Sequence, residues 1–198
     1  MCGRFALHAN PDVVALQFRL SAAPVFAPRY NIAPTAEILA VTERGAAPLR
    51  WGLFGKVHNL RADKPRGRLL PCLVPASGFY EWQRRGARKQ PFYVRPAHDA
   101  LFGFAGLYGH GTCAILTVEA NGALRAIHDR MPAIVATRDY ARWLGGEALA
   151  LAAAADESVT AYPVGAEINS GAAESARLVE PLPSGVAARG ASGSLFGD

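Results

Sequence analysis

Apolar positions in this chain come in short runs that Gly, Pro and polar residues interrupt, and this pattern predicts strands more than helices. The runs are rich in β-branched and aromatic residues, which favour extended backbone. The predicted strands are EILAVTE (37–43), CLVPASGFYEW (72–82), PFYVRP (91–96), LFGFAGLYG (101–109), CAILTVEA (113–120) and AIVAT (133–137). We expect them to build most of the core.

Helical signals are fewer. Asn10 and Pro11 provide an N-cap residue and a proline at the first helical position, directly before the apolar run VVALQFRL. A second helix is predicted from about Thr137 through Leu144, before a pair of glycines, and the alanine-rich stretch 147–155 either extends it or forms a short helix of its own. Several strands with two or three helices predict an α+β fold that is rich in β structure.

The length of 198 residues suits one domain with a tail. The last segment, 184–198 (SGVAARGASGSLFGD), is rich in Gly, Ser and Ala and predicts a flexible tail, which leaves residues 1–183 as the domain. The sequence has no apolar run of eighteen residues and no pattern of a secretory signal. We therefore expect no membrane span and a cytoplasmic location.

Cysteine count and charge narrow the function classes. The chain has three cysteines, an odd number without CxxC or Cys/His ligand spacing, so a disulfide framework or a structural zinc site is not expected. The formal net charge of +5 suits an anionic partner. A basic balance by itself describes solubility and encounter, and it does not assign nucleic-acid binding.

The chain begins with MCGRFAL, and Cys2 has two readings. Chain ends are usually frayed and tolerant of change, so a cysteine there can be without a role. If Met1 is removed, Cys2 instead carries a free α-amine and a thiol on one residue, a pair that no other position can offer. Position alone leaves both readings open.

Two titratable residues lie in segments that suit an acid–base pair. Glu81 lies between aromatic residues in SGFYEW, where a carboxylate that points outward to solvent is the commoner case. Its functional reading needs partial desolvation, which raises the pKa of a carboxyl group. His128 lies in the polar, proline-terminated loop AIHDRMP, where a structural and a catalytic role are about equally frequent.

Further residues are candidates for binding nucleic acid. Asn59 and Arg61 share a face if HNLRAD is extended, and Arg61 could then hold a phosphate, although a surface arginine in a loop is the commoner reading. Trp51, beside Gly52, and Pro34 in RYNIAPT offer apolar surfaces on which bases could stack. A tryptophan is more often part of the core.

Nine short segments follow one another along the chain: MCGRF, RYNIAPT, WGL, NLRAD, CLVPASGFYEW, PFYV, FAGLY, ILTVEAN and IHDRMP. Taken in this order, they resemble the SRAP family (SOS-response-associated peptidase), which includes sensors of abasic sites in single-stranded DNA. The resemblance extends to about residue 183, where YPVGAEINSG and LVEPL are similar to the family's last block. It implies one α+β domain, in which a few helices flank an open-barrel-like antiparallel sheet core.

The resemblance also implies roles for the candidate residues. Cys2 becomes covalently attached to DNA, Asn59 orients the N-terminal residue or the sugar, and Glu81 and His128 form the acid–base pair. The implied DNA contacts are Arg4, Pro34, Trp51, Arg61, Trp82 and Arg130. No metal and no organic cofactor are expected, because the opened sugar of an abasic site supplies the reactive aldehyde.

The implied partner is single-stranded DNA that contains an abasic site, also at junctions with duplex, and we expect a monomer that lies near the nucleoid if the source is bacterial. Two stretches, 54–58 and 64–71, are shorter than in many members of the family. Both are expected to be loops at the rim of the site. The preferred DNA structure therefore stays open, while all the implied catalytic positions are present.

The implied chemistry depends on the N-terminus. A neutral α-amine attacks the aldehyde, and the thiol of the same residue then closes a five-membered thiazolidine ring. Met1 must be absent for this reaction. Two other readings stay open: a hydrolase with an N-terminal cysteine, such as an autopeptidase that removes Met1, and a module that binds single-stranded or modified DNA without a covalent bond. Strand cleavage by a lyase reaction is compatible with the crosslinking chemistry, because an amine that forms an imine can also cleave the strand by β-elimination.

Overall fold

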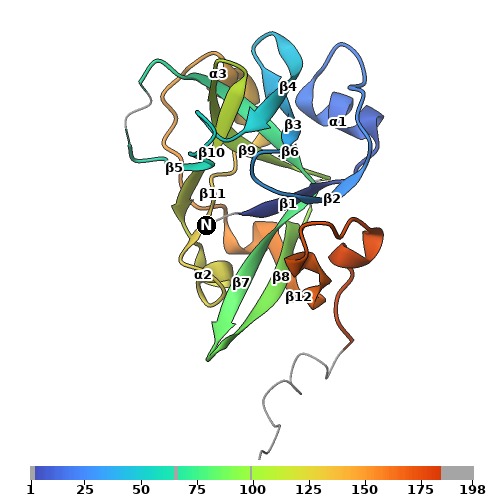
Figure 1. Cartoon of the computed structure of the whole chain (residues 1–198). Helices are drawn as coiled ribbons and strands as arrows, with labels where there is room; N and C mark the ends of the chain where they lie inside the picture. The colour runs from blue at the N-terminus through green and yellow to red at the C-terminus, as the bar shows by residue number, and fades with distance from the viewer. Residues whose placement is uncertain (1–2, 65–66, 99, 184–198) are drawn as a thin grey trace, which may run out of the picture.

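The computed structural model describes residues 3–64, 67–98 and 100–183 and shows a sheet-rich fold with few helices (Figure 1). The strands are β1 (Arg4–Leu7), β2 (Arg29–Ile32), β3 (Glu37–Thr42), β4 (Gly45–Trp51), β5 (Asn59–Arg61), β6 (Leu70–Ala76), β7 (Gly78–Arg85), β8 (Arg88–Pro96), β9 (Phe102–Gly109), β10 (Thr112–Glu119), β11 (Arg130–Pro132) and β12 (Val159–Pro163). The α-helices are α1 (Pro11–Phe18), α2 (Gly122–Arg125) and α3 (Tyr140–Leu144), and the 3-10 turns are η1 (Thr137–Asp139), η2 (Asp156–Ser158), η3 (Ala166–Asn169) and η4 (Ala176–Val179).

Five strands pair around a barrel-like ring in the order β4, β3, β6, β9 and β10. The β3–β4 and β6–β9 ladders are long, whereas β3 meets β6 at one register pair and β10 meets β4 at two. β10 runs parallel to β4 and β5, and the other ladders are antiparallel. The expected α+β fold with mostly antiparallel sheets and a few helices is confirmed. The expected core is like an open barrel, whereas the five strands close into a ring through the parallel β10–β4 pairing.

A second, antiparallel sheet has the strand order β12–β8–β7–β1–β2. Alternate residues of a strand point to opposite faces, and β1 follows this rule: Phe5 and Leu7 pack into the large core with the barrel, while Ala6 packs into a second cluster with Tyr80 and Tyr93. The C-terminal segment supplies Ile168 to that cluster and covers this face. β1 is therefore buried on both sides.

The helix predictions are confirmed near the N-terminus and around Trp143. α1 begins at Pro11, and the side chain of Asn10 caps it by accepting a hydrogen bond from the backbone N–H of Asp12 at 2.8 Å. The second helix begins as the 3-10 turn η1 at Thr137 and continues as α3. Residues 147–155 are irregular, so the helix that their alanine content predicted is wrong.

Most predicted strands are confirmed, and one is wrong. The run 72–82 is divided at Ser77 into β6 and β7, which belong to different sheets. Residues 133–137 form only an isolated bridge between Ile134 and Phe104. Among the residues that the structure describes, no helix is long and apolar enough to cross a bilayer. The predicted tail, 184–198, lies outside the described residues.

Candidate active site and nucleic-acid interface

Glu81 is a buried carboxylate on β7, only 4% exposed. It follows Tyr80, whose register partner is Arg4 of β1, so Glu81 lies at the end of β1 from which the chain starts. The outward-pointing orientation that is common for a lone glutamate does not occur here. Burial is the main reason why the pKa of Glu81 is raised to about 7, since a carboxylate loses its hydration there.

His128 lies in the loop after α2 and faces Glu81. Its Nε2 is 4.0 Å from Oε2 of Glu81, and its side chain is partly exposed. Partial burial lowers the pKa of His128 below its usual 6.5, while the pKa of Glu81 is raised. Burial thus reverses the usual order of the two pKa values, so that near neutral pH the carboxyl group of Glu81 can hold a proton beside a neutral imidazole. The sequence-predicted acid–base pair is therefore brought together.

The hydrogen bonds of His128 orient its ring. The backbone N–H of Arg130 donates to Nδ1 at 3.0 Å, so the neutral ring carries its proton on Nε2, the atom that faces Glu81. The carboxylate of Asp129 lies 2.8 Å from the same Nδ1 and suits the protonated ring. Each charge state thus has a partner at Nδ1: the backbone N–H of Arg130 for the neutral ring and Asp129 for the protonated ring. When the protonated ring gives up the proton on Nε2, Asp129 can hold the proton that stays on Nδ1, so the ring need not turn.

Asn59 and Arg61 come from β5, which pairs in parallel with β10. Asn59 is opposite Ile115 and Arg61 is opposite Thr117. The exposed guanidinium of Arg61 binds Asp63 through two hydrogen bonds, from Nε at 3.0 Å and from Nη2 at 2.9 Å. A phosphate that approaches Arg61 has to compete with Asp63, whose pKa is lowered to about 2 by this pairing and which therefore stays charged.

Three arginines line one cleft of about 670 Å³ beside β10. They are Arg61, Arg125 and Arg130, and the irregular segment 149–153 forms another part of the wall. Nη2 of Arg130 donates to the carbonyl oxygen and the hydroxyl of Thr117 at 2.6 and 2.9 Å, which fixes its guanidinium at the cleft. Arg125, which the sequence reasoning missed, has an ordinary surface sequence context, and only the fold shows that it shares the cleft.

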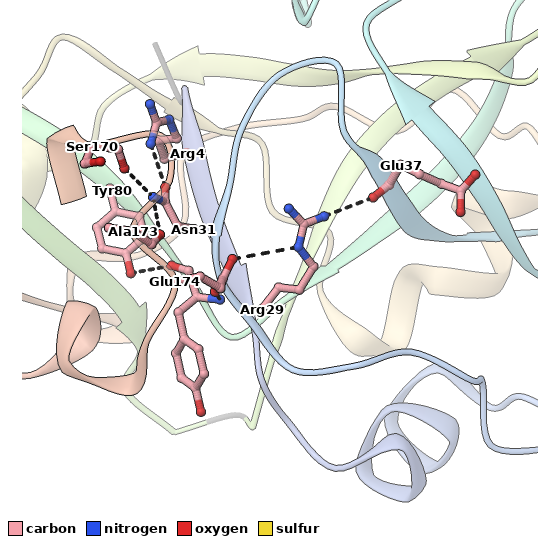
Figure 2. Close-up of polar contacts among 9 residues, drawn as sticks. Arg4, Arg29, Asn31, Glu37, Tyr80, Ser170, Ala173 and Glu174 are labelled. Carbon is pink, nitrogen blue, oxygen red and sulfur yellow. Dashed lines mark hydrogen bonds and ion pairs between the residues drawn. The ribbon is translucent and has the colours of Figure 1, made fainter. Parts of the chain in front are cut away.

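Arg4 belongs to a polar cluster between β1, β2 and the C-terminal segment (Figure 2). Its Nη1 donates to Oδ1 of the buried Asn31 at 2.6 Å and to the carbonyl oxygen of Ile168 at 3.2 Å. The Asn31 amide nitrogen in turn donates to the carbonyl oxygens of Ser170 and Ala173 at 3.0 and 2.8 Å. One nitrogen of Arg4 is thus used to hold the chain together, which the sequence did not predict.

Trp82 and Pro34 are both partly exposed, as a stacking surface requires. The indole N–H of Trp82 donates to Oδ1 of Asn169 at 2.8 Å, which fixes the ring plane against the C-terminal segment. Pro34 lies in the turn between β2 and β3. Both remain candidates for contact with bases.

The prediction that Trp51 offers a face to DNA bases is wrong. The ring is fully buried, its N–H donates to the carbonyl oxygen of His58 at 2.8 Å, and it packs edge-on against Phe5 with ring centroids 5.2 Å apart. The exposed aromatic residue of the same segment is Phe54, which is 73% accessible. The sequence WGLFGKV does not show which of its two aromatic rings is exposed, and for this reason the prediction named Trp51 and not Phe54.

Phe54 lies in a tight turn formed by residues 53–57. Reciprocal backbone hydrogen bonds of 2.9 and 3.0 Å join Leu53 and Val57 on either side of it. Phe54 has a φ of 53°, a left-handed conformation that is uncommon for a bulky residue and costs energy. The turn leads through His58 to Asn59, so its aromatic tip lies in the chain just before a candidate site residue.

Cys2, the candidate nucleophile, lies outside the described residues. The two other cysteines, Cys72 and Cys113, are fully buried free thiols. Burial raises the pKa of both, that of Cys113 to about 12, so neither is a useful nucleophile at neutral pH. Among the described residues, no group of three or more His, Cys, Asp or Glu side chains is arranged to hold a metal ion.

The family model described as SOS response associated peptidase (SRAP) matches residues 1–69 and 64–171 of the chain. The chain therefore belongs to this family.

Its relatives are proteins from bacteria and animals. The abasic site processing protein YoaM of Bacillus subtilis (strain 168) is 34% identical over 223 residues, which cover 91% of this chain and 98% of YoaM. The abasic site processing protein YedK of Escherichia coli (strain K12) is 27% identical and covers 92% of this chain and 100% of its own length. HMCES of Xenopus tropicalis, also named an abasic site processing protein, is 28% identical, with 73% of this chain and 66% of that protein covered.

Solved structures agree on the fold. A crystal structure of a protein from Bacteroides thetaiotaomicron has a TM-score of 0.79 at 21% identity and covers 92% of this chain and all of that chain. At this identity the likeness concerns the fold alone.

Proposed function

We propose that this protein processes abasic sites in DNA by forming a covalent thiazolidine crosslink between Cys2 and the opened sugar of the lesion in single-stranded DNA. The observation that carries the proposal is the Glu81–His128 pair, a buried carboxyl group with a pKa of about 7 next to an imidazole, at the end of β1 from which the chain starts. The names of the relatives support the choice of an abasic site as the substrate.

Chain connectivity limits how far Cys2 can be from this pair. Two residues of extended chain span about 7 Å, so the Cα atom of Cys2 is at most that far from the Cα atom of Arg4. Arg4 pairs with Tyr80, the neighbour of Glu81. A residue at position 2 is therefore within reach of the acid–base pair, whereas the thiols of Cys72 and Cys113 are enclosed in the core.

The free α-amine of Cys2 suits the first step. Its ordinary pKa is near 7.7–8 and that of a lysine is about 10.4, so a fraction larger by a factor of a few hundred is neutral at pH 7. In the proposed reaction the protonated ring of His128 gives the proton on Nε2 to the ring oxygen of the sugar and keeps the proton on Nδ1 beside Asp129. The bond between C1 and the ring oxygen breaks, and Glu81 takes the proton of the C1 hydroxyl as the aldehyde forms. The amine adds to the aldehyde carbon, and loss of one water yields the imine.

The thiol of Cys2 then closes the ring. Its sulfur bonds to the imine carbon, the nitrogen takes a proton, and a five-membered thiazolidine results, with no net oxidation or reduction. Glu81 accepts and returns the protons that the amine and the thiol release and take up. Both nucleophiles belong to one residue, so the second attack is intramolecular and has a high effective concentration. Asn59 orients the N-terminal residue or the sugar.

Cationic and aromatic side chains would hold the strand. Arg61 and Arg130 line the cleft beside β10, where phosphates can bind, and the guanidinium of Arg4 is the candidate cation for a phosphate next to the lesion. Trp82 and Phe54 offer partly or fully exposed rings on which the flanking bases can stack.

The test is incubation of the protein with a single-stranded oligonucleotide that contains one abasic site, followed by a denaturing gel and intact mass spectrometry. The wild type should lose Met1 and form a stable adduct whose mass equals protein plus DNA minus one water. Cys2→Ala and a form with residues fused before Cys2 should form no such adduct. As a control, Cys72→Ala with Cys113→Ala should form it as the wild type does. Absence of the adduct in the wild type, or its persistence in Cys2→Ala, overturns the proposal.

The same experiment distinguishes the other readings. Cleavage of added peptides without a DNA adduct would support a hydrolase, and tight binding of undamaged DNA that survives Cys2→Ala would support a non-covalent module. A cleaved strand in Cys2→Ala would indicate lyase chemistry by another amine.

A further inference from the structure

The hairpin of β7 and β8 extends beyond its neighbours in the sheet. β1 pairs with β7 only up to Tyr80, and β12 pairs with β8 only from Phe92 onward. Residues 83–90 therefore continue as a two-stranded ribbon, which projects from the molecule at the end away from α1 and the β3–β4 turn (Figure 1). Its end carries four exposed cationic residues, which we call the ribbon tip: Arg84, Arg85, Arg88 and Lys89.

The charge of the ribbon tip is concentrated and of one sign. Four of the chain's 21 Lys and Arg residues lie within six positions, and the sequence has no Asp or Glu between Glu81 and Asp99. In the ladder, Arg84 is directly opposite Lys89. Like charges directly opposite each other on two strands repel. Such a placement becomes favourable when a chain of negative charges lies alongside it.

The base of the ribbon is fixed to the rest of the molecule. Nε2 of Gln83 donates to the carbonyl oxygen of Ala126 at 2.9 Å, and Nε2 of Gln90 donates to that of Val164 at 3.0 Å. Ala126 is two residues before His128, so the first of these bonds joins the ribbon to the loop of the acid–base pair. The direction of the ribbon relative to the site is therefore set by the fold.

The spacing along β7 relates the ribbon tip to the site. Arg84 shares a strand face with Trp82, and at about 3.4 Å per residue it lies about 7 Å further along. Arg85 shares a face with Glu81 and lies about 13 Å from it. Phosphates of one strand of B-form DNA repeat every 3.4 Å along the axis, so these distances correspond to about two to four nucleotides.

We propose that the ribbon tip binds the phosphate backbone of the DNA that flanks the abasic site, outside the reaction centre. The placement of the lesion at Glu81 and His128 rests on the function proposed above. The tip would hold the flanking strand, or the duplex that continues it, by charge and without reading its sequence. It would thereby raise the affinity for long DNA and leave the chemistry of the crosslink unchanged.

The test compares two doubly substituted proteins on two lengths of DNA. Arg84→Gln with Lys89→Gln removes one opposed pair of the tip. The matched control, Arg19→Gln with Arg44→Gln, removes two exposed cations at the end of α1 and in the β3–β4 turn. Binding and crosslinking are measured against salt with abasic oligonucleotides of about five and about 25 nucleotides, lengths that exclude and include the flanks.

We expect the tip variant to bind the long DNA about tenfold more weakly at low salt, with a slope of log K against log salt that is smaller by about 1.4, for two cations on a single strand. Binding of the short DNA, and crosslinking at saturating DNA, should equal those of the wild type. The control should resemble the wild type on both lengths.

Three results would overturn the proposal: equal losses in the tip variant and the control, equal losses on both lengths of DNA, or no loss on either. Loss of tip-dependent binding and absence of the crosslink are separate readouts. If the wild type forms no crosslink while its binding to the long DNA still depends on the ribbon tip, the proposed function fails and the proposed role of the ribbon tip stands.

Discussion

At the scale of single residues, the surroundings of Glu81 decide its chemistry. A carboxylate that is buried beside an imidazole is expensive to ionise, and the same cost gives it a pKa at which it can exchange protons near pH 7. Activity and stability are therefore opposed at this position.

Glu81→Gln should stabilise the protein at high pH while it slows the crosslink. The pKa of Glu81 is about 7 in the folded protein and 4.5 in the unfolded chain, so the carboxyl group favours the folded state below pH 4.5, and this contribution is lost as the pH rises through 7. The shift corresponds to about 3 kcal/mol. The free energy of unfolding, measured with urea at pH 4.5, 6 and 8, should show a gain that grows with pH and levels off above 7. A gain that is the same at all three pH values would contradict this account, and Glu43→Gln, on an exposed turn, serves as the control.

At the scale of elements, the sequence predicted correctly those helices and strands whose formation depends mainly on neighbouring residues. α1 has its cap and its proline in adjacent positions, and the structure begins the helix there. The alanine-rich segment 147–155 has a high helix propensity, yet it runs irregularly along the cleft, because tertiary contacts override a weak local preference. The parallel pairing of β5 with β10 joins residues more than fifty positions apart, and no local sequence pattern predicts it.

Burial was the least predictable property of the candidate site. Trp51 lies in LRWGL and Trp82 in YEWQR, and neither segment shows whether its ring is buried. The first ring belongs to the barrel core and the second is partly exposed. His128 and Glu81 could be named as candidates from their segments and the family resemblance. Their 4.0 Å separation depends on the packing of the loop after α2 near β7, which the sequence does not show.

The turn at 53–57 is the element on which a stacking role can be tested. Phe54→Ala removes an exposed ring without disturbing the core, so the melting temperature should stay within a degree or two of the wild type. Base–aromatic stacking contributes about 1–3 kcal/mol, so binding of abasic single-stranded DNA should weaken roughly tenfold. Phe54→Trp should keep or strengthen binding. Equal affinity of the alanine variant and the wild type would remove Phe54 from the interface.

At the scale of the whole molecule, the two ends of the described chain are joined at Asn31. This side chain is buried, accepts a hydrogen bond from Arg4 near the start, and donates two to residues 170 and 173 near the end (Figure 2). The nearby carboxylate of Glu174 adds an ion pair with Arg29 at 3.9 Å. The C-terminal segment therefore helps to fix the strand that carries the N-terminus.

Asn31→Ala should loosen both ends together. It removes one of the two acceptors of Nη1 of Arg4 and the amide donor to the carbonyl oxygens of Ser170 and Ala173, which we expect to cost about 2–3 kcal/mol in the free energy of unfolding. Hydrogen exchange should increase in β1 and in residues 166–175 while β6 and β9 stay protected. Asn31→Asp keeps the acceptor for Arg4 and lacks the two donors, so it should release the C-terminal segment more than β1. Uniform acceleration over the whole chain would mean that Asn31 supports the global fold only.

The central position of β1 in its sheet has a consequence during synthesis of the chain, because β1 is made long before some of its partners. Phe5 is synthesised 74 residues before its register partner Phe79, and His128 follows later still. Throughout that interval β1 can pair with β2 but not with β7, and the Glu81–His128 pair does not yet exist. On the function proposed above, an aminopeptidase can therefore remove Met1 before the site is assembled.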